Sequence, residues 1–407
     1  MLRNLRIALF LVHRAVSRGN KGTFALTVLI ITLAFVNMTF VSSIMSGVVD
    51  SIHTAVKENY VGNIVVEPTS DEHYIERVAQ LEELIETTPG VVACSPRYSV
   101  GATVTYRPDE DDESVRQVSW PMQSFDPGKE KQVTHLHEWL VAGEFLDERD
   151  RDQILLGREV SGGYGAEVVL QSLRGIEVGD ELWVSFGNGI KRTYTVKGII
   201  ATKFPLVDMG MFITEKEMES VIGLHDRASQ ILIRTEEPGQ EHRDVQRLRE
   251  RGLTEVELHP WTDYLGFFKS LTDSLFLIAR MVSGIGLLVA GITIFIVIYI
   301  TVVGRRRQIG ILKALGMNER VITMSYVLQA LLYGLIGIGL GVCVMYFGLL
   351  PRFNAHPLQF PMGAVSLVIT ARALVANAAG LVAVSIVGGF VPSSRVARAD
   401  IIKAIWG

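Results

Sequence analysis

The sequence contains little cysteine, and it lacks the motifs that define several classes of enzyme. Cys94 lies in a polar region and Cys343 in a long apolar stretch, so we expect no intramolecular disulfide. The phosphate-loop pattern G-x-x-x-x-G-K-[ST] is absent, which excludes an ATPase site of that type within these residues. No nucleophile–base set or carboxylate pair has a spacing typical of catalysis. We therefore expect no catalytic residues and no cofactor bound by this chain.

Charge is absent from four long stretches of the chain. The sequence has 407 residues, a mean hydropathy of +0.30 and 48% apolar residues, and the apolar residues are gathered in blocks. A membrane-spanning helix needs roughly 20 apolar residues. Residues 24–45, 281–304, 321–350 and 373–392 reach that length. The first is too long for a signal peptide and precedes no A-x-A-like cleavage site, so we interpret it as an uncleaved anchor.

Positive charge is concentrated in the short segments that flank these stretches. Five Lys and Arg residues precede residue 22 without an acid, and five lie in 305–320 against Glu319 alone. Residues 50–273 instead carry 41 acidic residues against 23 Lys and Arg. Lys and Arg accumulate in short cytoplasmic segments. We expect a multi-pass protein of the cell (inner) membrane, with both termini and 305–320 cytoplasmic and the acidic region extracytoplasmic.

The predicted fold is an α-helical membrane protein with four transmembrane helices and a large α+β extracytoplasmic domain between the first and second. The expected segments are a cytoplasmic N-terminal segment (1–22), a first span continuing outward as a stalk (23–46), the extracytoplasmic domain (47–272), a stalk and second span (262–304), a cytoplasmic link (305–320), a third span (321–350), an outer loop (351–371), a fourth span (372–392) and a cytoplasmic tail (393–407).

Short periodic patterns predict the elements of the extracytoplasmic domain. NIVVE predicts a strand ended by Pro68, and 72–87 has apolar residues at helical spacing. ELWVSF and KRTYTVKGII, joined by Gly-Asn-Gly, predict a hairpin. MFIT, EKEMESVIGL and SQILIRT predict a strand, a helix and a strand, followed by a helix over 242–251 and the strand TEVELH. These elements are sufficient for one or two compact subdomains.

Helical periodicity continues beyond two of the spans. Apolar residues recur every three or four positions from Tyr264 to Ile278, Thr262 or Asp263 can serve as N-cap, and nothing breaks the pattern before Gly304. About 42 residues at ~1.5 Å each give ~63 Å, roughly twice the hydrocarbon thickness. SGVVDSIHTAVKENY after the first span keeps a similar stripe. We expect two rigid stalks.

The link at 305–320 predicts a short amphipathic helix. Ile309, Leu312 and Leu315 are expected on one face, Gly316 suits a C-cap and Asn318 suits the N-cap of the next span. One interpretation is a loop whose cations only set orientation and contact anionic lipid. The other is a docking helix inserted in the groove of a cytoplasmic partner, and the caps at both ends favour it.

The stretch RRRQIGILKALGMNERVITMSYVLQALLYGLIGIGLG resembles the signature of the FtsX/MacB-type (type VII) ABC transporter permeases, which include the LolC/LolE lipoprotein-release subunits. Gln308 and Gln329 replace acids often found in the family, so neither can form an ion pair. The order of spans and the tail PSSRVARADIIKAI are also similar to the family. The signature covers Arg306, Ile309, Gly310, Leu312, Lys313, Ala314, Leu315 and Gly316, then Gly334, Gly337, Gly339 and Gly341.

The resemblance implies a permease subunit without a fused ATPase domain, whose link is a coupling helix resting on a separate cytoplasmic ABC ATPase dimer. ATP and Mg would be bound by that partner. A second permease chain, identical or related, the lipid bilayer and an extracytoplasmic accessory protein are further implied partners, whereas nucleic acid is not. The implied coupling residues are Arg306, Gln308, Ile309, Gly310, Leu312, Lys313, Leu315 and Gly316, and Gly334, Gly337 and Gly341 are expected to pack helices, within the chain or in a dimer.

Two functions follow from this resemblance. One is export or extraction of a lipoprotein, lipid, peptide or other amphiphile, driven by ATP hydrolysis that moves the extracytoplasmic domain (mechanotransmission). The alternative is an ATP-driven regulator of an external partner, such as a cell-wall hydrolase, with no transported substrate. A receptor or scaffold without an ATPase is a third hypothesis, which the link motif disfavours.

Two polar clusters are candidate metal sites. His135-x-His137-Glu138 would place two imidazoles on one face of a strand, but no third ligand is evident, which favours a surface segment. The acidic run at 109–113 lacks the alternating spacing and the glycine of a calcium loop, which favours a solvated loop. We expect no metal site.

Overall fold

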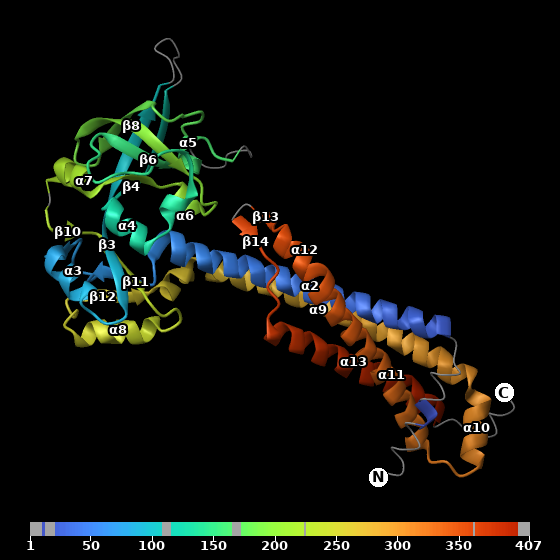
Figure 1. The fold of residues 1–407 in the computed structure, drawn as a ribbon. Helices are drawn as coiled ribbons and strands as arrows, with labels where there is room; N and C mark the ends of the chain where they lie inside the picture. Colours follow the sequence, from blue (N-terminus) through green and yellow to red (C-terminus); the bar gives the residue numbers. More distant parts are fainter. Residues whose placement is uncertain are drawn as a thin grey trace. The chain divides into compact units, whose positions relative to one another are not determined.

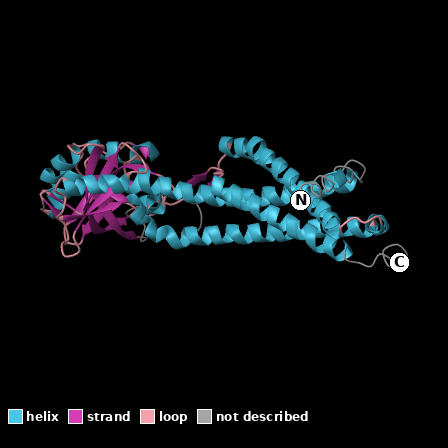
Figure 2. Cartoon of the chain, turned by 90° about the horizontal axis from the view of Figure 1, so that it is seen from below, coloured by secondary structure: helices cyan, strands magenta, loops and turns pink. Residues whose placement is uncertain are grey.

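A computed structural model describes residues 10–12, 21–107, 115–164, 172–223, 225–360 and 363–397. The chain forms two compact units, one comprising Met1–Asp50, Leu271–Gln359 and Ala364–Gly407, the other Ser51–Ser270 and Phe360–Gly363. Long helices dominate the first unit, and most strands lie in the second (Figure 2). The predicted fold class is confirmed, with an α+β domain inserted between the first and second of the long helices. The predicted N-terminal segment lies almost wholly outside the described residues.

Within the described residues, four helical segments are long and apolar enough to cross a membrane. They comprise α2 (Lys21–Ala55) with the π-helix η1 (Val56–Val61), α9 (Gly266–Gly304), α11 (Glu319–Cys343) with the π-helix η4 (Val344–Leu349) and α12 (Leu350–Ala355), and α13 (Ala371–Ala397). In the helical unit α2 and α9 lie side by side (Figure 1). Gly286 of α9 has no side chain, which leaves room for the side chain of Met38 on α2.

Three boundaries differ from those predicted. The second stalk begins as a 3-10 turn at Trp261–Leu265, and its α-helix starts only at Gly266. The third helical segment reaches Ala355, and a short hairpin of β13 (Leu358–Phe360) and β14 (Gly363–Val365) follows. The fourth helix continues past Pro392 to Ala397, and the hydroxyl of Ser393 donates to the carbonyl of Gly389 at 2.6 Å.

The α+β unit has a layer of antiparallel strands covered by two helices. β12 (Val256–Pro260), β1 (Ile64–Pro68), β11 (Gln230–Thr235) and the first half of β3 (Val91–Tyr106) pair in that order. α3 (Val78–Glu86) and α8 (Glu241–Glu250) pack on the strands (Figure 1). The buried residues of this layer include Ile64, Ile85, Ile231, Ile233 and Leu248.

The second half of β3 enters a closed ring of strands. It pairs with β4 (Arg116–Phe125) and with β7 (Glu181–Phe186). β9 (Met211–Thr214), β6 (Gln153–Gly157) and β8 (Lys191–Ile200) complete the ring, because β4 pairs with β9, β9 with β6, β6 with β8, and β8 with β7. β5 (Leu140–Gly143) adds to β8 outside the ring. A closed barrel removes the unpaired edges that would otherwise invite aggregation.

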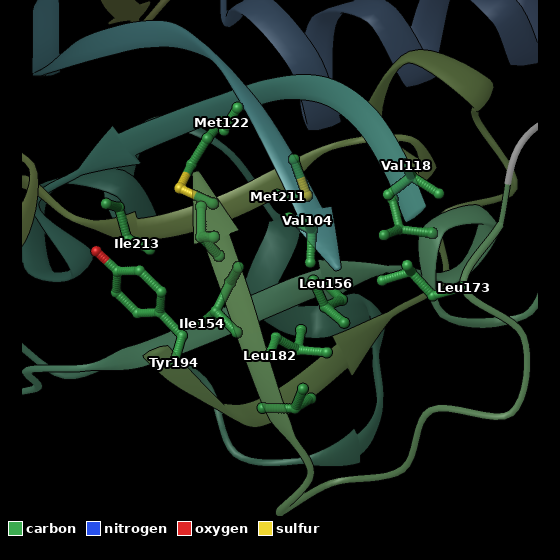
Figure 3. Close-up of a cluster of buried hydrophobic side chains, with 14 of the residues drawn as sticks. Val104, Val118, Met122, Ile154, Leu156, Leu173, Leu182, Tyr194, Met211 and Ile213 are labelled. Atoms are coloured by element: carbon green, nitrogen blue, oxygen red, sulfur yellow. The ribbon is translucent and has the colours of Figure 1, made fainter. Parts of the chain in front are cut away.

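Alternation along the barrel strands places one set of side chains inside. Val104, Met122, Ile154, Leu156 and Leu182 converge in the barrel interior and are almost fully buried (Figure 3). Tyr194 joins them and donates its hydroxyl hydrogen to Glu217 at 3.1 Å. The period-2 pattern therefore leaves the alternate residues of the same strands, such as Thr103, Trp183 and Thr193, facing outward.

Most predicted elements of this unit are confirmed, but one helix is shorter than expected. The hairpin, the strand–helix–strand succession with α7 (Glu215–Ile222), and the final helix and strand are present. The helix predicted over 72–87 begins only at Val78, because Ile75 and Glu76 form β2 (Ile75–Glu76) and pair with β10 (Arg227–Ala228). Asp226 then caps the helix, accepting a bond from the backbone N–H of Ala79 at 2.7 Å.

Candidate coupling site

The link between the second and third long helices folds as the short helix α10 (Arg306–Ala314). Gly316 adopts φ +89°, a left-handed conformation that glycine reaches without strain. The N–H of Gly316 donates to the carbonyl of Lys313 at 2.9 Å, and the N–H of Met317 donates to that of Leu312 at 3.0 Å. This pair of bonds is a Schellman C-cap. The predicted role of Gly316 in ending the helix is confirmed.

The next helix begins within two residues of that cap. The side chain of Asn318 accepts a bond from the N–H of Arg320 at 3.0 Å, as expected of an N-cap. Lys313 Nζ lies 2.8 Å from Glu319 Oε1, which joins α10 to the first turn of α11. α10 is therefore attached to α11 at its C-terminal end by a backbone cap, a short turn and an ion pair. These contacts restrict movement of α10 relative to α11.

One face of α10 is buried in the helical unit. Ile309 is 3% exposed and belongs to a cluster with Val302, Ile322 and Tyr326. Gly310 is buried beside it. Leu312 is half-buried and lines a small cavity of about 90 Å³ together with Gln308, Arg305 and Gln329. The chain's own helices thus cover Ile309 and Gly310, so these two residues are not available to a docked partner.

The prediction that Ile309, Leu312 and Leu315 share one face is wrong. Leu315 is 80% exposed, because six residues at about 100° each place it roughly 120° away from Ile309 around the helix axis. Ile311, which is 48% exposed, lies one turn before Leu315 on the same side and was not among the predicted site residues. Its i, i+4 spacing to Leu315 is the signal that identifies it.

We call Arg307, Gln308, Ile311 and Leu315 the outer face of α10. All four side chains are exposed. Two large aliphatic side chains lie next to a guanidinium and an amide, a composition that suits contact with another protein. Arg306 is also exposed at the start of the helix, whereas Lys313 is largely covered and paired with Glu319. The predicted coupling residues therefore divide into an exposed set and a set that anchors α10 to its own chain.

The glycines of α11 allow close approach of two neighbouring helices. A Cβ added at Gly337 would lie 2.6 Å from the side chain of Ile31 on α2, and one at Gly341 would lie 2.5 Å from Phe35. A Cβ at Gly334 would lie 2.6 Å from Ser385 Oγ on α13, whereas Gly339 has nothing within 4 Å. The face carrying Gly337 and Gly341 is therefore occupied by the chain's own first span, as small residues at helix crossings permit.

Gln329 lies in the interior of the helical unit, at 4% exposure. Its side-chain amide donates to the hydroxyl of Tyr333 one turn later. The amide at this position, where an acid is often found in the family, therefore has a hydrogen-bond partner within α11.

In the α+β unit, a polar cluster holds the end of the first stalk. Arg97 Nη1 donates to the backbone carbonyl of Tyr60 in η1 at 3.1 Å. The backbone N–H of His135 donates to the backbone carbonyl of Glu58 at 2.9 Å. Arg97 also pairs with Glu130 of α4 (Pro127–Val133) at 2.5 Å, and both side chains are 1% exposed. Burial alone would raise the pKa of Glu130, but Arg97 outweighs it and holds that pKa below its ordinary value.

The beginning of the second stalk is attached to the same unit by its aromatic residues. Trp261 Nε1 donates to Glu241 Oε1 at 3.2 Å, and the hydroxyl of Tyr264 donates to Glu67 Oε1 at 2.5 Å. Phe268 packs its ring against Phe204, with centroids 5.5 Å apart. Both stalks are therefore anchored to strands and helices of the α+β unit by specific side chains.

The structure describes one of the two candidate metal sites, the His135–Glu138 segment. The His135–Glu138 segment includes a 3-10 turn over Leu136–Trp139 rather than the strand assumed for metal binding. His135 Nδ1 lies 3.7 Å from Glu58. Among the residues that the structure describes, no group of three His, Cys, Asp or Glu side chains could hold a metal ion. The acidic run at 109–113 lies outside the described residues.

Comparison with known proteins identifies both parts of the chain. Residues 24–250 match the family described as MacB-like periplasmic core domain, and residues 280–401 match the FtsX-like permease C-terminal family. A macrolide export ATP-binding/permease protein MacB of Rhodopseudomonas palustris is 29% identical over 134 residues, covering 33% of this chain and 20% of that protein. A protein of the same name from Neisseria gonorrhoeae is 27% identical over 173 residues, covering 39% and 25%. The chain thus spans a quarter or less of these relatives' length.

Two solved structures are also similar to the chain. The extracellular domain of the noncanonic ABC-type transporter YknZ from Gram-positive bacteria is 13% identical, with a TM-score of 0.34, over 49% of this chain and 97% of that chain. The periplasmic region of MacB from Actinobacillus actinomycetemcomitans is 11% identical, with a TM-score of 0.35, over 53% and 97%. Because the core-domain match alone covers more than half of the 407 residues, the chain belongs to the FtsX/MacB-type permease family.

Proposed function

We propose that this chain is the permease subunit of an ABC transporter, in which a separate cytoplasmic ATPase dimer moves the α+β domain on the other side of the membrane. The observation that carries the proposal is the outer face of α10. It exposes Ile311 and Leu315 on a short helix that ends in a backbone C-cap and whose opposite side is buried in its own chain. A helix of this kind can dock in a partner's groove and still be rigidly attached to the spans.

The anchoring residues of α10 support transmission of force. Ile309 is embedded among side chains of α9 and α11, and the Lys313–Glu319 ion pair closes the turn to α11. Because packed interiors are close to incompressible, displacement of α10 would be passed to both helices rather than absorbed between them. The Arg97 cluster and the Trp261–Tyr264 contacts would receive that displacement at the far ends of the stalks.

The composition of the spans supports an amphiphile rather than an ion or a small polar solute as the substrate class. Residues 24–45, 281–304, 321–350 and 373–392 contain no Asp, Glu, Lys, Arg or His. Pathways for ions and polar solutes are marked by such residues inside the membrane. We infer that a lipoprotein, lipid, peptide or other amphiphile is exported, or extracted from the outer leaflet, without crossing a polar central path. A second permease chain would complete the twofold assembly that an ATPase dimer requires.

Charge supports the orientation that this mechanism needs. The link around α10 carries five Lys and Arg residues against one acid, and residues 50–273 carry 41 acids against 23 Lys and Arg. By the positive-inside rule, α10 and both termini would be cytoplasmic, and the α+β domain extracytoplasmic.

Replacing Leu315 by Asp, alone or with Ile311→Asp, tests the docking role directly. Burying an unpaired carboxylate in a partner's apolar groove is costly, so we expect the ATPase to co-purify at least about tenfold less well. The tagged chain would be extracted in mild detergent from its own host, and the captured nucleotide-binding subunit measured by mass spectrometry and ATP turnover.

Val178→Asp is the matched control, because it makes the same change at an exposed apolar side chain of the α+β domain. It should leave capture of the ATPase intact. Membrane insertion and yield of all variants are compared on the same preparations. Normal ATPase capture and turnover by a well-inserted Leu315→Asp chain would rule out the outer face of α10 as the docking surface.

A further inference from the structure

The outer surface of the barrel carries a groove that the coupling mechanism does not use. It has a volume of about 660 Å³ and runs over β4, β3, β7 and β8. Small-molecule and cofactor sites typically have volumes of about 300–1,000 Å³. Its lining includes Thr105, Gln117, Trp183, Lys191 and Thr193, together with Arg107.

Strand pairing arranges the polar side chains of this groove in two rows. In the first row Gln117 pairs with Thr105, Thr105 with Trp183, and Trp183 with Thr193. Directly paired residues on one face have Cβ atoms about 4.5–5.5 Å apart. The row therefore presents an amide, a hydroxyl, an indole and a second hydroxyl in sequence across four strands.

The second row lies two residues further along each strand and is also rich in hydroxyl groups. Thr103, Ser185 and Lys191 of this row line the groove: Thr103 pairs with Ser185, and Ser185 with Lys191, while Ser119, which is not part of the lining, pairs with Thr103. Thr103 and Ser119 are joined by a hydrogen bond of 2.9 Å between their hydroxyl oxygens. Each hydroxyl can donate one bond and accept two, so the rows keep capacity for an external ligand.

Trp183 is the large aromatic side chain at the centre of the groove. It is 48% exposed, and among the described residues its indole nitrogen makes no hydrogen bond to the protein. A tryptophan that belongs to the core would be packed by neighbours on both ring faces, as Phe186 and Tyr194 are on the inner side of the same strands. The indole of Trp183 instead offers an open ring face and a free N–H donor.

The charge of the groove is opposite to that of the surrounding domain. Lys191 and Arg107 are exposed and form no ion pair with any described residue, whereas Arg192 lies within 4.0 Å of Asp152 and 3.8 Å of Glu217. Residues 50–273 as a whole have 41 acids against 23 Lys and Arg. Among the described residues these two cations have no acidic partner, and beside an exposed indole they favour an anionic ligand in a domain that is otherwise acidic.

We propose that this groove binds an anionic saccharide chain, one bearing carboxylate or phosphate groups. The apolar C–H face of a sugar ring stacks on an indole, its hydroxyl groups bond to the Thr, Ser and Gln rows, and its charged groups meet Lys191 and Arg107. The site needs no nucleotide and stands apart from the coupling role of α10.

Other anionic ligands fit the same surface less well. An acidic peptide such as poly-glutamate could meet the two cations, but it has no ring hydroxyl groups to pair with the two hydroxyl-rich rows. A lipid headgroup would need an apolar channel for its acyl chains, which the lining of the groove does not contain. A single-stranded nucleic acid shares the stacking and charge requirements and is a competitor in the test.

Binding would be measured on the full chain in nanodiscs, without nucleotide, using biotinylated hexagalacturonate as the probe and maltohexaose as the neutral saccharide. We expect saturable binding of hexagalacturonate and at least about tenfold weaker binding of maltohexaose. Trp183→Ala should lower the affinity for hexagalacturonate about tenfold, because a central aromatic anchor dominates such sites. Lys191→Gln should weaken binding about threefold and flatten its dependence on salt.

Trp139→Ala is the matched control, since Trp139 is similarly exposed (41%) but lies outside the groove. The Trp139→Ala chain should bind hexagalacturonate with the same affinity as the original chain. No binding of hexagalacturonate up to about 10 mM would overturn the proposal, as would an unchanged affinity of a correctly folded Trp183→Ala chain. Tighter binding of poly-glutamate or of a single-stranded oligonucleotide, with the same dependence on Trp183, would assign the groove to that ligand instead.

Discussion

Burial decides how much an ion pair contributes in this protein. Arg77 and Glu255 are 2.6 Å apart, but their side chains are 64% and 77% exposed, so their pair is worth about 0–1 kcal/mol. Arg97 and Glu130 are both 1% exposed, and Ser95 and Thr134 supply further bonds to the carboxylate. Removing one partner of a buried pair typically costs about 3–5 kcal/mol. Because Arg97 also donates to Tyr60, the Arg97–Glu130 pair holds the end of the first stalk in place.

A half-buried carboxyl, that of Glu215, gives the α+β domain a pH-dependent stability. Burial raises the pKa of Glu215 from its ordinary value of 4.5 to about 7. Lys129 opposes that increase, while Glu82, Glu219 and Asp126 add to it. The unfolded chain loses this proton near its ordinary pKa, before the folded chain does. Stability therefore falls as pH rises from about 4.5 to about 7, and it levels off above that range.

Glu215→Gln should remove this part of the pH dependence, because the amide stays neutral at every pH. At about pH 8 the variant should unfold at a temperature about 2–4 °C higher than the original chain, and near pH 5 the two should coincide. Thermal unfolding of the full chain in detergent, followed by tryptophan fluorescence, measures the difference. Glu181→Gln, at an exposed side chain of β7, should keep the original slope. A constant difference between Glu215→Gln and the original chain from pH 5 to 8 would contradict the assignment.

Elements whose signals are local in the sequence were predicted well. The four spans follow from uncharged apolar runs, and the hairpin of β7 and β8 follows from alternation around Gly187–Gly189. The caps at Gly316 and Asn318 follow from residue type. The face of α10 that points outward could not be chosen from Ile309, Leu312 and Leu315 alone, because Ile309 faces side chains of α9 and α11 that are distant in sequence.

The barrel could not be predicted from the sequence for a related reason. Its closure depends on the parallel pairs β4–β9 and β6–β8 and on β7 returning to β3. Phe125 pairs with Thr214 and Thr105 with Trp183, across some 80 to 90 residues, and no local pattern specifies such partners. The shortened α3 has the same cause, since the pairing of Ile75 with Ala228 prevails over helical spacing.

The packing of α11 against α2 gives a prediction with a control in the same helix. Gly337→Leu would place atoms 2.6 Å from the Ile31 side chain and 3.4 Å from the backbone nitrogen of Thr32, so the two helices must separate. Gly339→Leu adds the same side chain two residues later, where nothing lies within 4 Å. Overpacking costs about 1–3 kcal/mol, so Gly337→Leu should lower the midpoint of thermal aggregation in detergent, and Gly339→Leu should not. Equal midpoints for both variants would show that α2 does not pack on this face.

Charge and hydropathy together favour one orientation of the whole protein across the membrane. The cations cluster around α10 and near the two termini, whereas the α+β domain holds 41 of the 43 acidic residues between Asp50 and Asp273. The two ends of the proposed transmission are thus separated by spans without charged residues. The proposed mechanism requires α10 to lie on the cytoplasmic side, where an ATPase can reach it, and the α+β domain to lie on the other side of the membrane.

Site-specific labelling of cysteine tests that requirement. Cys343 would be replaced by Ser, and Leu315→Cys or Val178→Cys introduced, both at exposed positions. Cys94 can remain, because it is buried and burial raises the pKa of its thiol to about 12, so little reactive thiolate forms. A membrane-impermeant maleimide should label Val178→Cys in spheroplasts and Leu315→Cys only after lysis. Labelling of Leu315→Cys in sealed spheroplasts would place α10 outside, where no cytoplasmic ATPase could reach it, and the coupling mechanism would fail.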